Sequence, residues 1–177
     1  MNVEKPDLIT QRLRLRLPKM SDAKRLTELV STEYISVMSR LPFPYRKKDA
    51  MKWVTEAQKN FLSVGIVYYV IVAAETDEVI GTASAVVQYG SWTAEMGYWI
   101  GEKYWGKGFA TEAAGRLLAH LVETMHLKRV YANAAVENTA SQRVLEKIGM
   151  EQEQLLENEK DNYGRVMDVY VYAVNRE

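Results

Sequence analysis

The residues best placed to do chemistry lie between 94 and 125, where a strand, a glycine turn and a helix follow one another. The strand covers 94–100, and the turn reads Trp105-Gly106-Lys107-Gly108-Phe109-Ala110. One face of the helix is apolar and is formed by Ala110, Ala113, Ala114, Leu117, Leu118, Leu121, Val122 and Met125. The first amides of a helix have no intrahelical acceptor, and glycine lets an anion approach them closely. The sequence therefore predicts a phosphate-type site at this turn.

The spacing of the glycines separates different kinds of phosphate site. A nucleoside triphosphate loop needs Gly-Lys followed by Ser or Thr, whereas Lys107 is followed by Gly108. A dinucleotide loop needs a third glycine at the position of Thr111. Neither pattern fits, and the run alone is also compatible with a glycine-rich crossover that binds nothing.

The run 104–113 resembles motif A of the GNAT superfamily of N-acetyltransferases, [QR]-x-x-G-x-[GA]. Gly108 and Ala110 fill its last two fixed positions, in the form seen in the RimJ/RimL-type branch. Trp105 stands at the Gln/Arg position, which is a departure from the pattern. In that family the loop amides hold the pyrophosphate of acetyl coenzyme A.

Two further runs are similar to the same branch. Residues 138–150, Asn-Thr-Ala-Ser-x-x-Val-Leu-Glu-Lys-x-Gly-Met, resemble motif B, and residues 8–16 resemble the opening of RimJ/RimL-type sequences. Motifs in the right order and spacing are far more specific than either alone. The resemblance therefore covers nearly the whole chain.

The hydrophobic patterns predict the order β-α-α-β-β-β-α-β-α-β-β. This order resembles the GNAT fold: a mixed α/β (α+β) domain over 1–177, whose largely antiparallel central sheet contains a splayed parallel pair and is flanked by helices. The predicted strands are 12–17, 66–74, 79–88, 94–100, 129–136, 150–157 and 165–174. The predicted helices are 21–38, 48–62, 110–125 and 140–148.

Three local expectations concern single residues. Ser21 is expected to cap the first helix, with Asp22 complementing the helix dipole. His120 is expected in solvent, opposite the apolar face of its helix.

Composition limits the function classes. Lys plus Arg number 23 and Asp plus Glu 23, so no net charge attracts nucleic acid or an anionic membrane. The chain has no cysteine and two histidines, which argues against a nucleophilic cysteine and against a metal site. The start lacks an apolar signal region, and the longest nearly apolar run, 64–74, is too short to span a bilayer. A cytoplasmic protein is expected, as a monomer or homodimer.

The resemblance implies how acetyl coenzyme A is held. Peptide groups along the strand would pair with pantetheine, and turn amides would take the pyrophosphate, with added charge from Lys107. Asn138 either contacts the pantetheine side or simply caps its helix. The expected binding residues are Tyr98, Trp99, Ile100, Trp105, Gly106, Lys107, Gly108, Phe109, Ala110, Thr111 and Asn138.

Two residues are catalytic candidates. Glu95 lies on the strand beside the cofactor and is either a base for the amine, directly or through water, or a structural charge. Ser141 matches the position proposed in RimL-type enzymes as the acid for the departing thiolate, or it satisfies helix amides. Tyr98, Glu157 and Glu159 are weaker alternatives for the base.

The leading hypothesis is an acetyl-CoA-dependent N-acetyltransferase that acts on a primary amine, either a protein N-terminus or a small molecule. A second hypothesis is a module that senses acetyl-CoA without turnover. A third, nucleic-acid binding through Arg12, Arg14 and Arg16, is less favoured than a solvated strand face.

Overall fold

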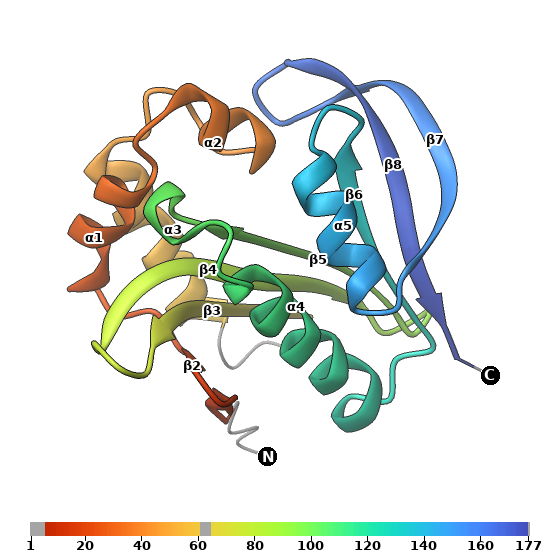
Figure 1. Ribbon diagram of the computed structural model, residues 1–177, viewed down its shortest axis with the longest axis horizontal. Helices are drawn as coiled ribbons and strands as arrows, with labels where there is room; N and C mark the ends of the chain where they lie inside the picture. The colour runs from red at the N-terminus through yellow and green to blue at the C-terminus, as the bar shows by residue number, and fades with distance from the viewer. Residues whose placement is uncertain (1–5, 61–64, 177) are drawn as a thin grey trace.

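The computed structural model describes residues 6–60 and 65–176 (Figure 1). Its strands form one sheet in the order β1-β2-β3-β4-β5-β6-β8-β7. Neighbouring strands are antiparallel except β5 and β6, which are parallel, so the predicted mixed sheet is confirmed. The strands are β1 (Leu8–Ile9), β2 (Leu13–Arg16), β3 (Ile66–Ala73), β4 (Glu78–Gln88), β5 (Thr93–Ile100), β6 (Arg129–Ala135), β7 (Glu151–Lys160) and β8 (Val166–Asn175).

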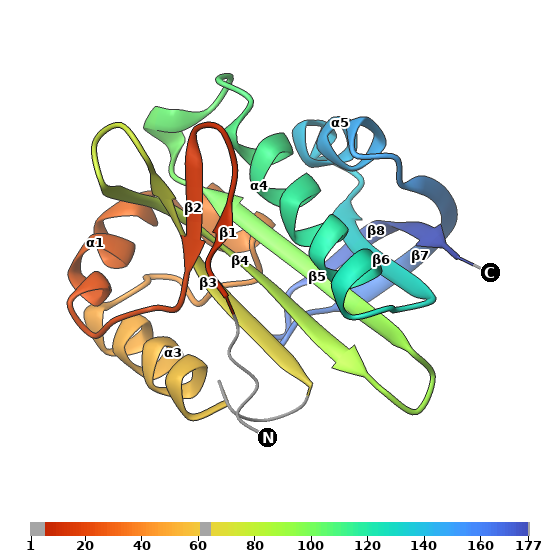
Figure 2. The ribbon, with the colours of Figure 1, turned by 90° about the horizontal axis from the view of Figure 1, so that it is seen from below.

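Helices cover both faces of the sheet (Figures 1 and 2). One face is covered by α1 (Asp22–Leu29) and α3 (Lys47–Asn60), with the short α2 (Glu33–Met38) beside them, and the other by α4 (Phe109–Ala119) and α5 (Thr139–Lys147). Strand alternation divides the apolar side chains between these two layers. In β3, for example, Tyr69 and Ile71 face the α4 layer, whereas Val70 and Val72 face α1 and α3.

Two predicted elements differ from the structure. The expected helix over 21–38 is two helices, because Thr32 is extended and its hydroxyl accepts the N–H of Ile35, which begins α2. The strand β1 was not predicted, since two residues carry no periodic signal. The end of the helix predicted over 48–62 lies outside the described residues, because 61–64 are among those not described.

His120 is buried, with 6% of its surface exposed, rather than in solvent. It lies three residues after Leu117 and therefore at the flank of the apolar face, not opposite it. There the helix also passes into a π-helical turn, His120–Thr124.

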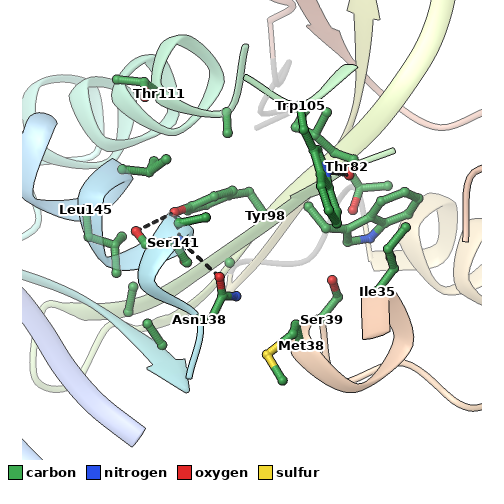
Figure 3. A pocket seen from close by; sticks show the side chains of 18 of the residues that line it. Ile35, Met38, Ser39, Thr82, Tyr98, Trp105, Thr111, Asn138, Ser141 and Leu145 are labelled. Carbon is green, nitrogen blue, oxygen red and sulfur yellow. Dashed lines mark hydrogen bonds between the residues drawn. The ribbon is translucent and has the colours of Figure 1, made fainter. Parts of the chain in front are cut away.

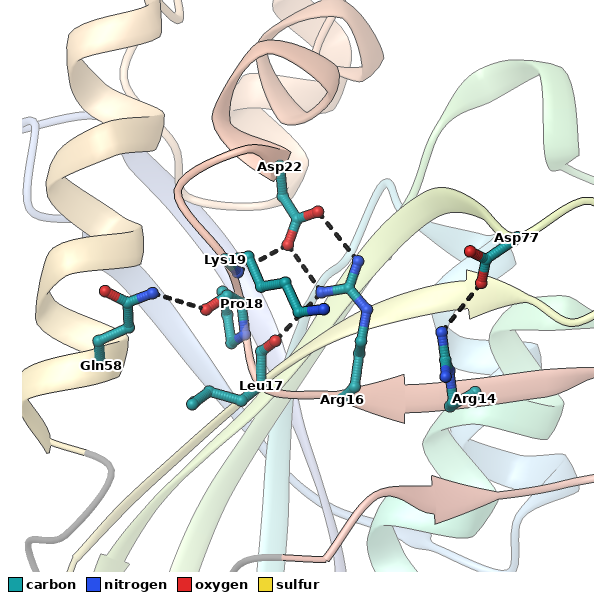
Figure 4. Close-up of polar contacts among 8 residues, drawn as sticks. All are labelled: Arg14, Arg16, Leu17, Pro18, Lys19, Asp22, Gln58 and Asp77. Atoms are coloured by element: carbon teal, nitrogen blue, oxygen red, sulfur yellow. Dashed lines mark hydrogen bonds and ion pairs between the residues drawn. The ribbon is translucent and has the colours of Figure 1, made fainter.

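The start of α1 is fixed by Asp22 rather than by the expected Ser21 cap, whose side chain makes no capping bond. Asp22 accepts two hydrogen bonds from the Arg16 guanidinium, at 2.8 and 2.9 Å, and one from the N–H of Lys19, at 2.7 Å (Figure 4). The pair is nearly buried, and the hydrogen bond to Asp22 raises the pKa of Arg16 above its usual value. The neighbouring Arg14 pairs with Asp77 at the surface, at 2.9 Å.

A polar clamp ties the β1–β2 turn to the first turn of α4. Glu112 accepts the Thr10 hydroxyl at 2.6 Å, the Arg12 N–H at 2.9 Å and the Arg12 Nε at 2.7 Å. Arg12 also donates to the carbonyl of Lys107, at 3.0 Å, and its guanidinium lies 4.7 Å from the ring centre of Phe109. The glycine turn is thus held from outside by the N-terminal hairpin. Each of the three arginines of the Arg-Leu-Arg-Leu-Arg run is engaged with a carboxylate of this chain.

In the ranges that the structure describes, no helix has both the length and the apolar character needed to span a membrane.

The clamp predicts a pH-dependent contribution to stability. Burial disfavours the charged form of Glu112, but the hydrogen bonds from Thr10 and Arg12 outweigh it and lower the carboxyl pKa. A lowered pKa contributes stability above the unfolded-state value that is lost as pH falls through the folded-state value. Glu112→Gln should therefore reduce the free energy of unfolding by about 1–2 kcal/mol at pH 7, and the difference from wild type should vanish in acid. Urea unfolding between pH 7 and pH 3 measures this.

Asp77→Asn is the matched control, because it removes an exposed ion pair and should cost less than about 1 kcal/mol. A deficit of Glu112→Gln that stays constant down to pH 3 would contradict a charged clamp.

Candidate active site

The parallel strands β5 and β6 part after three residue pairs. Their pairing runs from Thr93 opposite Arg129 to Glu95 opposite Tyr131, yet β5 continues to Ile100. The other edge of β5 stays paired with β4 along its length. The predicted splayed pair is thus present, and the second half of β5 borders a gap on one side.

The peptide groups that face the gap follow from the alternation of β5. The N–H of Gly101 donates to Ile80 across the β4 side, at 2.9 Å. Alternate residues direct their peptide groups to the same neighbour, so those of Met96, Tyr98 and Ile100 turn toward the gap. The carbonyl of Ile100 agrees with this, because it accepts the indole N–H of Trp105 at 2.6 Å. Trp99, predicted to share this role, directs its peptide groups to β4 and reaches the site through its side chain.

The gap opens into a cavity of about 510 Å³ that is lined from both faces of the sheet. Ile35, Met38 and Ser39 border it from α2, while Ser141 and Leu145 border it from α5 on the opposite side (Figure 3). The cavity therefore passes through the plane of the sheet. A ligand held along β5 would be reachable from the α2 side and from the α4 side.

The glycine turn forms one end of this cavity. Gly106 and Gly108 have left-handed backbones, with φ of 72° and 78°, and Gly108 is the N-cap of α4. Within the described part of the chain, the N–H groups of Phe109, Ala110 and Thr111 have no acceptor. These amides, at the positive end of the helix dipole, suit a phosphate group. A Cβ at Gly108 would lie 3.4 Å from the Arg12 guanidinium, so the turn is closely packed behind the amides.

Tyr98 and Ser141 meet on the α4–α5 side of the gap. Their hydroxyl oxygens are 3.0 Å apart, and the Tyr98 hydroxyl is also 3.3 Å from the Ser141 carbonyl (Figure 3). Burial raises the pKa of Tyr98 to about 12, although the Ser141 hydrogen bond lowers it in part. Tyr98 therefore stays protonated at neutral pH. Asn138 caps α5 by accepting the Ser141 N–H at 3.1 Å, which is the plainer of its two expected roles, and it also lines the cavity.

Glu95 lies on the opposite face, among polar groups that the sequence does not bring together. Its Oε1 accepts the side-chain amide of Asn133 at 3.1 Å and is 3.8 Å from a guanidinium nitrogen of Arg40. Tyr131 is the pairing partner of Glu95 on β6; its pKa is raised by burial and then by the Glu95 charge. Glu95 thus borders the cavity as a half-exposed carboxylate with a loose cationic partner.

Nearly all the predicted site residues border this one cavity. The exception among the binding residues is Lys107, whose ammonium lies over the ring of Tyr104 while its carbonyl belongs to the clamp. Glu157 and Glu159, the alternative bases, do not line it either. The predicted residues that do are Glu95, Tyr98, Trp99, Ile100, Trp105, Gly106, Gly108, Phe109, Ala110, Thr111, Asn138 and Ser141.

Three residues that border the cavity, Tyr34, Arg40 and Asn133, were not predicted from the sequence. Tyr34 makes an edge contact with Trp105, with ring centres 6.1 Å apart, and so joins α2 to the glycine turn. Arg40 and Asn133 carried no motif. Asn133 had one signal, since an amide flanked by alanines in a mostly buried strand has to find a polar partner.

Comparison with known proteins agrees with this architecture. The family model described as the acetyltransferase (GNAT) domain matches residues 12–151. A Bacillus licheniformis protein named uncharacterized N-acetyltransferase p20 is 33% identical, covering 94% of both chains. The [ribosomal protein uS5]-alanine N-acetyltransferase of Escherichia coli strain K12 is 29% identical, covering 86% of this chain and 81% of its own.

Among solved structures, RimL, the ribosomal L7/L12 alpha-N-protein acetyltransferase, in complex with coenzyme A, has the same fold. Its TM-score is 0.83 at 22% identity, with 97% of this chain and 98% of that chain covered. The chain therefore belongs to the GNAT family of acetyltransferases, with relatives in the RimJ/RimL branch, and is an N-acetyltransferase.

Proposed function

We propose that this protein transfers an acetyl group from acetyl-CoA to a primary amine by direct attack in a ternary complex. The observation that carries the proposal is the free edge of β5, which leads along the cavity to the unpaired amides at the start of α4. A relative that acts on a ribosomal protein and a fold neighbour in complex with coenzyme A support the same assignment.

The donor would be held by main-chain groups. The amides at the start of α4 would bind the pyrophosphate, and the peptide groups of Tyr98, with the carbonyl of Met96, would pair with the amide-containing arm as a neighbouring strand does. The Ile100 carbonyl is already occupied by Trp105, so at Ile100 the N–H is the group left for the ligand. This N–H would face the thioester oxygen and stabilise the negative charge that develops on it.

Deprotonation of the amine is assigned to Glu95. Alkyl amines have pKa values near 10 and N-terminal amines near 8, so both are largely protonated at neutral pH. The amine would lose a proton to Glu95, directly or through water, and its nitrogen would attack the thioester carbon. The carbon–sulfur bond then breaks, and the sulfur leaves as a thiolate toward the opposite side of the gap. The nitrogen's second proton passes to the thiolate, directly or through water, which leaves the amide and free coenzyme A.

The departing sulfur would meet the Ser141 hydroxyl, which is itself in contact with the Tyr98 hydroxyl. The raised pKa of Tyr98 keeps its proton in place, so its hydroxyl can donate to the Ser141 oxygen. The Ser141 proton is then free to point to the departing sulfur. Tyr98 would thus position Ser141, whose hydroxyl would stabilise the departing thiolate through a hydrogen bond without giving up its proton.

The direct test is thiol release from acetyl-CoA in the presence of a panel of amines and short peptides, with mass spectrometry of the acceptor. An acetylated acceptor formed in proportion to free coenzyme A supports the proposal. Binding of acetyl-CoA without turnover on any acceptor would instead point to a sensor module.

Gly108→Val should abolish acetyl-CoA binding while the fold persists. The valine side chain would crowd the amides that meet the pyrophosphate and the Arg12 guanidinium behind them. Isothermal titration with acetyl-CoA measures the loss, and far-UV circular dichroism checks the fold.

Gly164→Val is the matched control, because Gly164 has the same φ of 78°, open space around its Cβ and no part in the cavity. Both variants should lose about 1–2 kcal/mol of stability, and equal affinities in the two would refute the binding role of the turn.

Glu95→Gln should lower kcat/KM by roughly 100-fold at pH 7, because glutamine cannot accept the amine proton. The deficit should narrow toward pH 10, where the acceptor amine loses its proton unaided. Initial rates between pH 6 and pH 10 measure it, and the exposed Glu123→Gln serves as control. A profile that only shifts down by a constant factor would remove Glu95 from proton transfer.

A further inference from the structure

Arg40 occupies a backbone position that suits glycine better than arginine. It follows α2 with φ of 52°, the N–H of Arg40 donates to the carbonyl of Val37, and the N–H of Leu41 donates to that of Ser36. These two bonds form a Schellman motif, whose left-handed residue is usually glycine. An arginine here is strained, and such outliers cluster at functional sites.

The side chain of Arg40 reaches the cavity and has a weak partner there. Its closest guanidinium nitrogen is 3.8 Å from Glu95, and 37% of the side chain is exposed. A pair this long and this open is easily exchanged for other partners. The other cations that line the cavity among the described residues, Arg143 and Lys147, come from α5 on the far face. On the α2 side, Arg40 and Glu95 are therefore the two charges that an acceptor meets.

Asn133 fixes the orientation of Glu95. Its amide nitrogen donates to Glu95, since a carboxylate accepts and cannot donate. Its Oδ1 is buried and has no hydrogen-bond partner within the described residues. Because this oxygen is enclosed, Asn133 acts by holding the Glu95 carboxylate at the cavity rather than by contacting an acceptor.

From this cluster, and resting on the proposed function, we propose that Arg40 selects acceptors whose primary amine is accompanied by a carboxylate. The amine meets the Glu95 carboxylate, and the carboxylate of the acceptor takes the fork of Arg40, so a zwitterion exchanges one internal ion pair for two new ones. A diamine instead sets its second positive charge against Arg40 and is disfavoured. Two sources share this chemistry: a free amino acid, and a peptide whose N-terminal residue is Asp or Glu.

The experiment compares three acceptors of one length: 4-aminobutyrate, butylamine and 1,4-diaminobutane. Wild type should show kcat/KM for 4-aminobutyrate about tenfold above that for the other two, because a bidentate arginine–carboxylate pair is stronger than a single exposed ion pair. In Arg40→Gln the three values should fall within about threefold of each other. In Arg40→Glu the order should reverse in favour of the diamine. A second arm compares kcat/KM for two peptide amides, one beginning with Asp and one with Asn. If the carboxylate raises kcat/KM more among the peptides than among the small amines, the acceptor is a peptide; the opposite result indicates a free amino acid.

Controls separate this role from folding and from the proposed function. Arg40→Gly relieves the backbone strain, so it should keep or raise the unfolding midpoint while losing the carboxylate preference. Arg14→Gln removes another surface ion pair and should leave the preference unchanged. Acceptor binding is also measured by titration in the presence of coenzyme A, so the preference can be seen even if no acceptor is acetylated. Equal binding and equal turnover of the three acceptors by wild type, or a preference that survives Arg40→Gln, overturns the proposal.

Discussion

The parting of β5 from β6 is the constraint on which the rest of this site depends. A strand inside a sheet satisfies its peptide groups on both edges, and β5 gives up half of one edge beyond Glu95. Buried peptide groups without partners are costly, so the gap is stable where water or an extended ligand can take them. Trp105 satisfies the last of these carbonyls, which ends the open edge at Ile100 and beside the glycine turn. The cavity thus lies where β5 and β6 would be paired if the two strands had not diverged.

The glycine turn at the head of the cavity needs support of its own. Gly106 and Gly108 provide backbone conformations that other residues resist, and the same freedom would leave an isolated turn poorly ordered. Arg12 and Glu112 supply the order by joining the turn carbonyl, the first turn of α4 and the N-terminal hairpin. Because this hairpin begins the sheet, the geometry of the turn is coupled to strands on the far side of the cavity from α5. A carboxylate in the first turn of α4 also suits the helix dipole.

The sequence was most informative where the signal is local. The apolar face of α4, the alternation in β2 and the glycine turn each follow from residues close together in the chain, and each is present as predicted. The sequence does not show whether Ser21 or Asp22 fixes the start of α1. The partner of Asp22, Arg16, lies on β2, and their pairing appears only in the folded structure. The cluster of Arg40, Glu95 and Asn133 brings together three elements, and the left-handed turn at Arg40 is hidden because no glycine marks it.

The period of two along β5 places candidate catalytic groups on both faces of the sheet. Glu95 and Trp99 face the layer of α1–α3, whereas Met96, Tyr98 and Ile100 face α4 and α5. In an intact sheet these faces would be separated by the backbone of the neighbouring strand. Since β6 diverges, a carboxylate from one face and the Tyr98–Ser141 pair from the other border the same space. In the proposed mechanism, an acceptor beside α2 and a departing sulfur near α5 would therefore lie on opposite faces of the sheet.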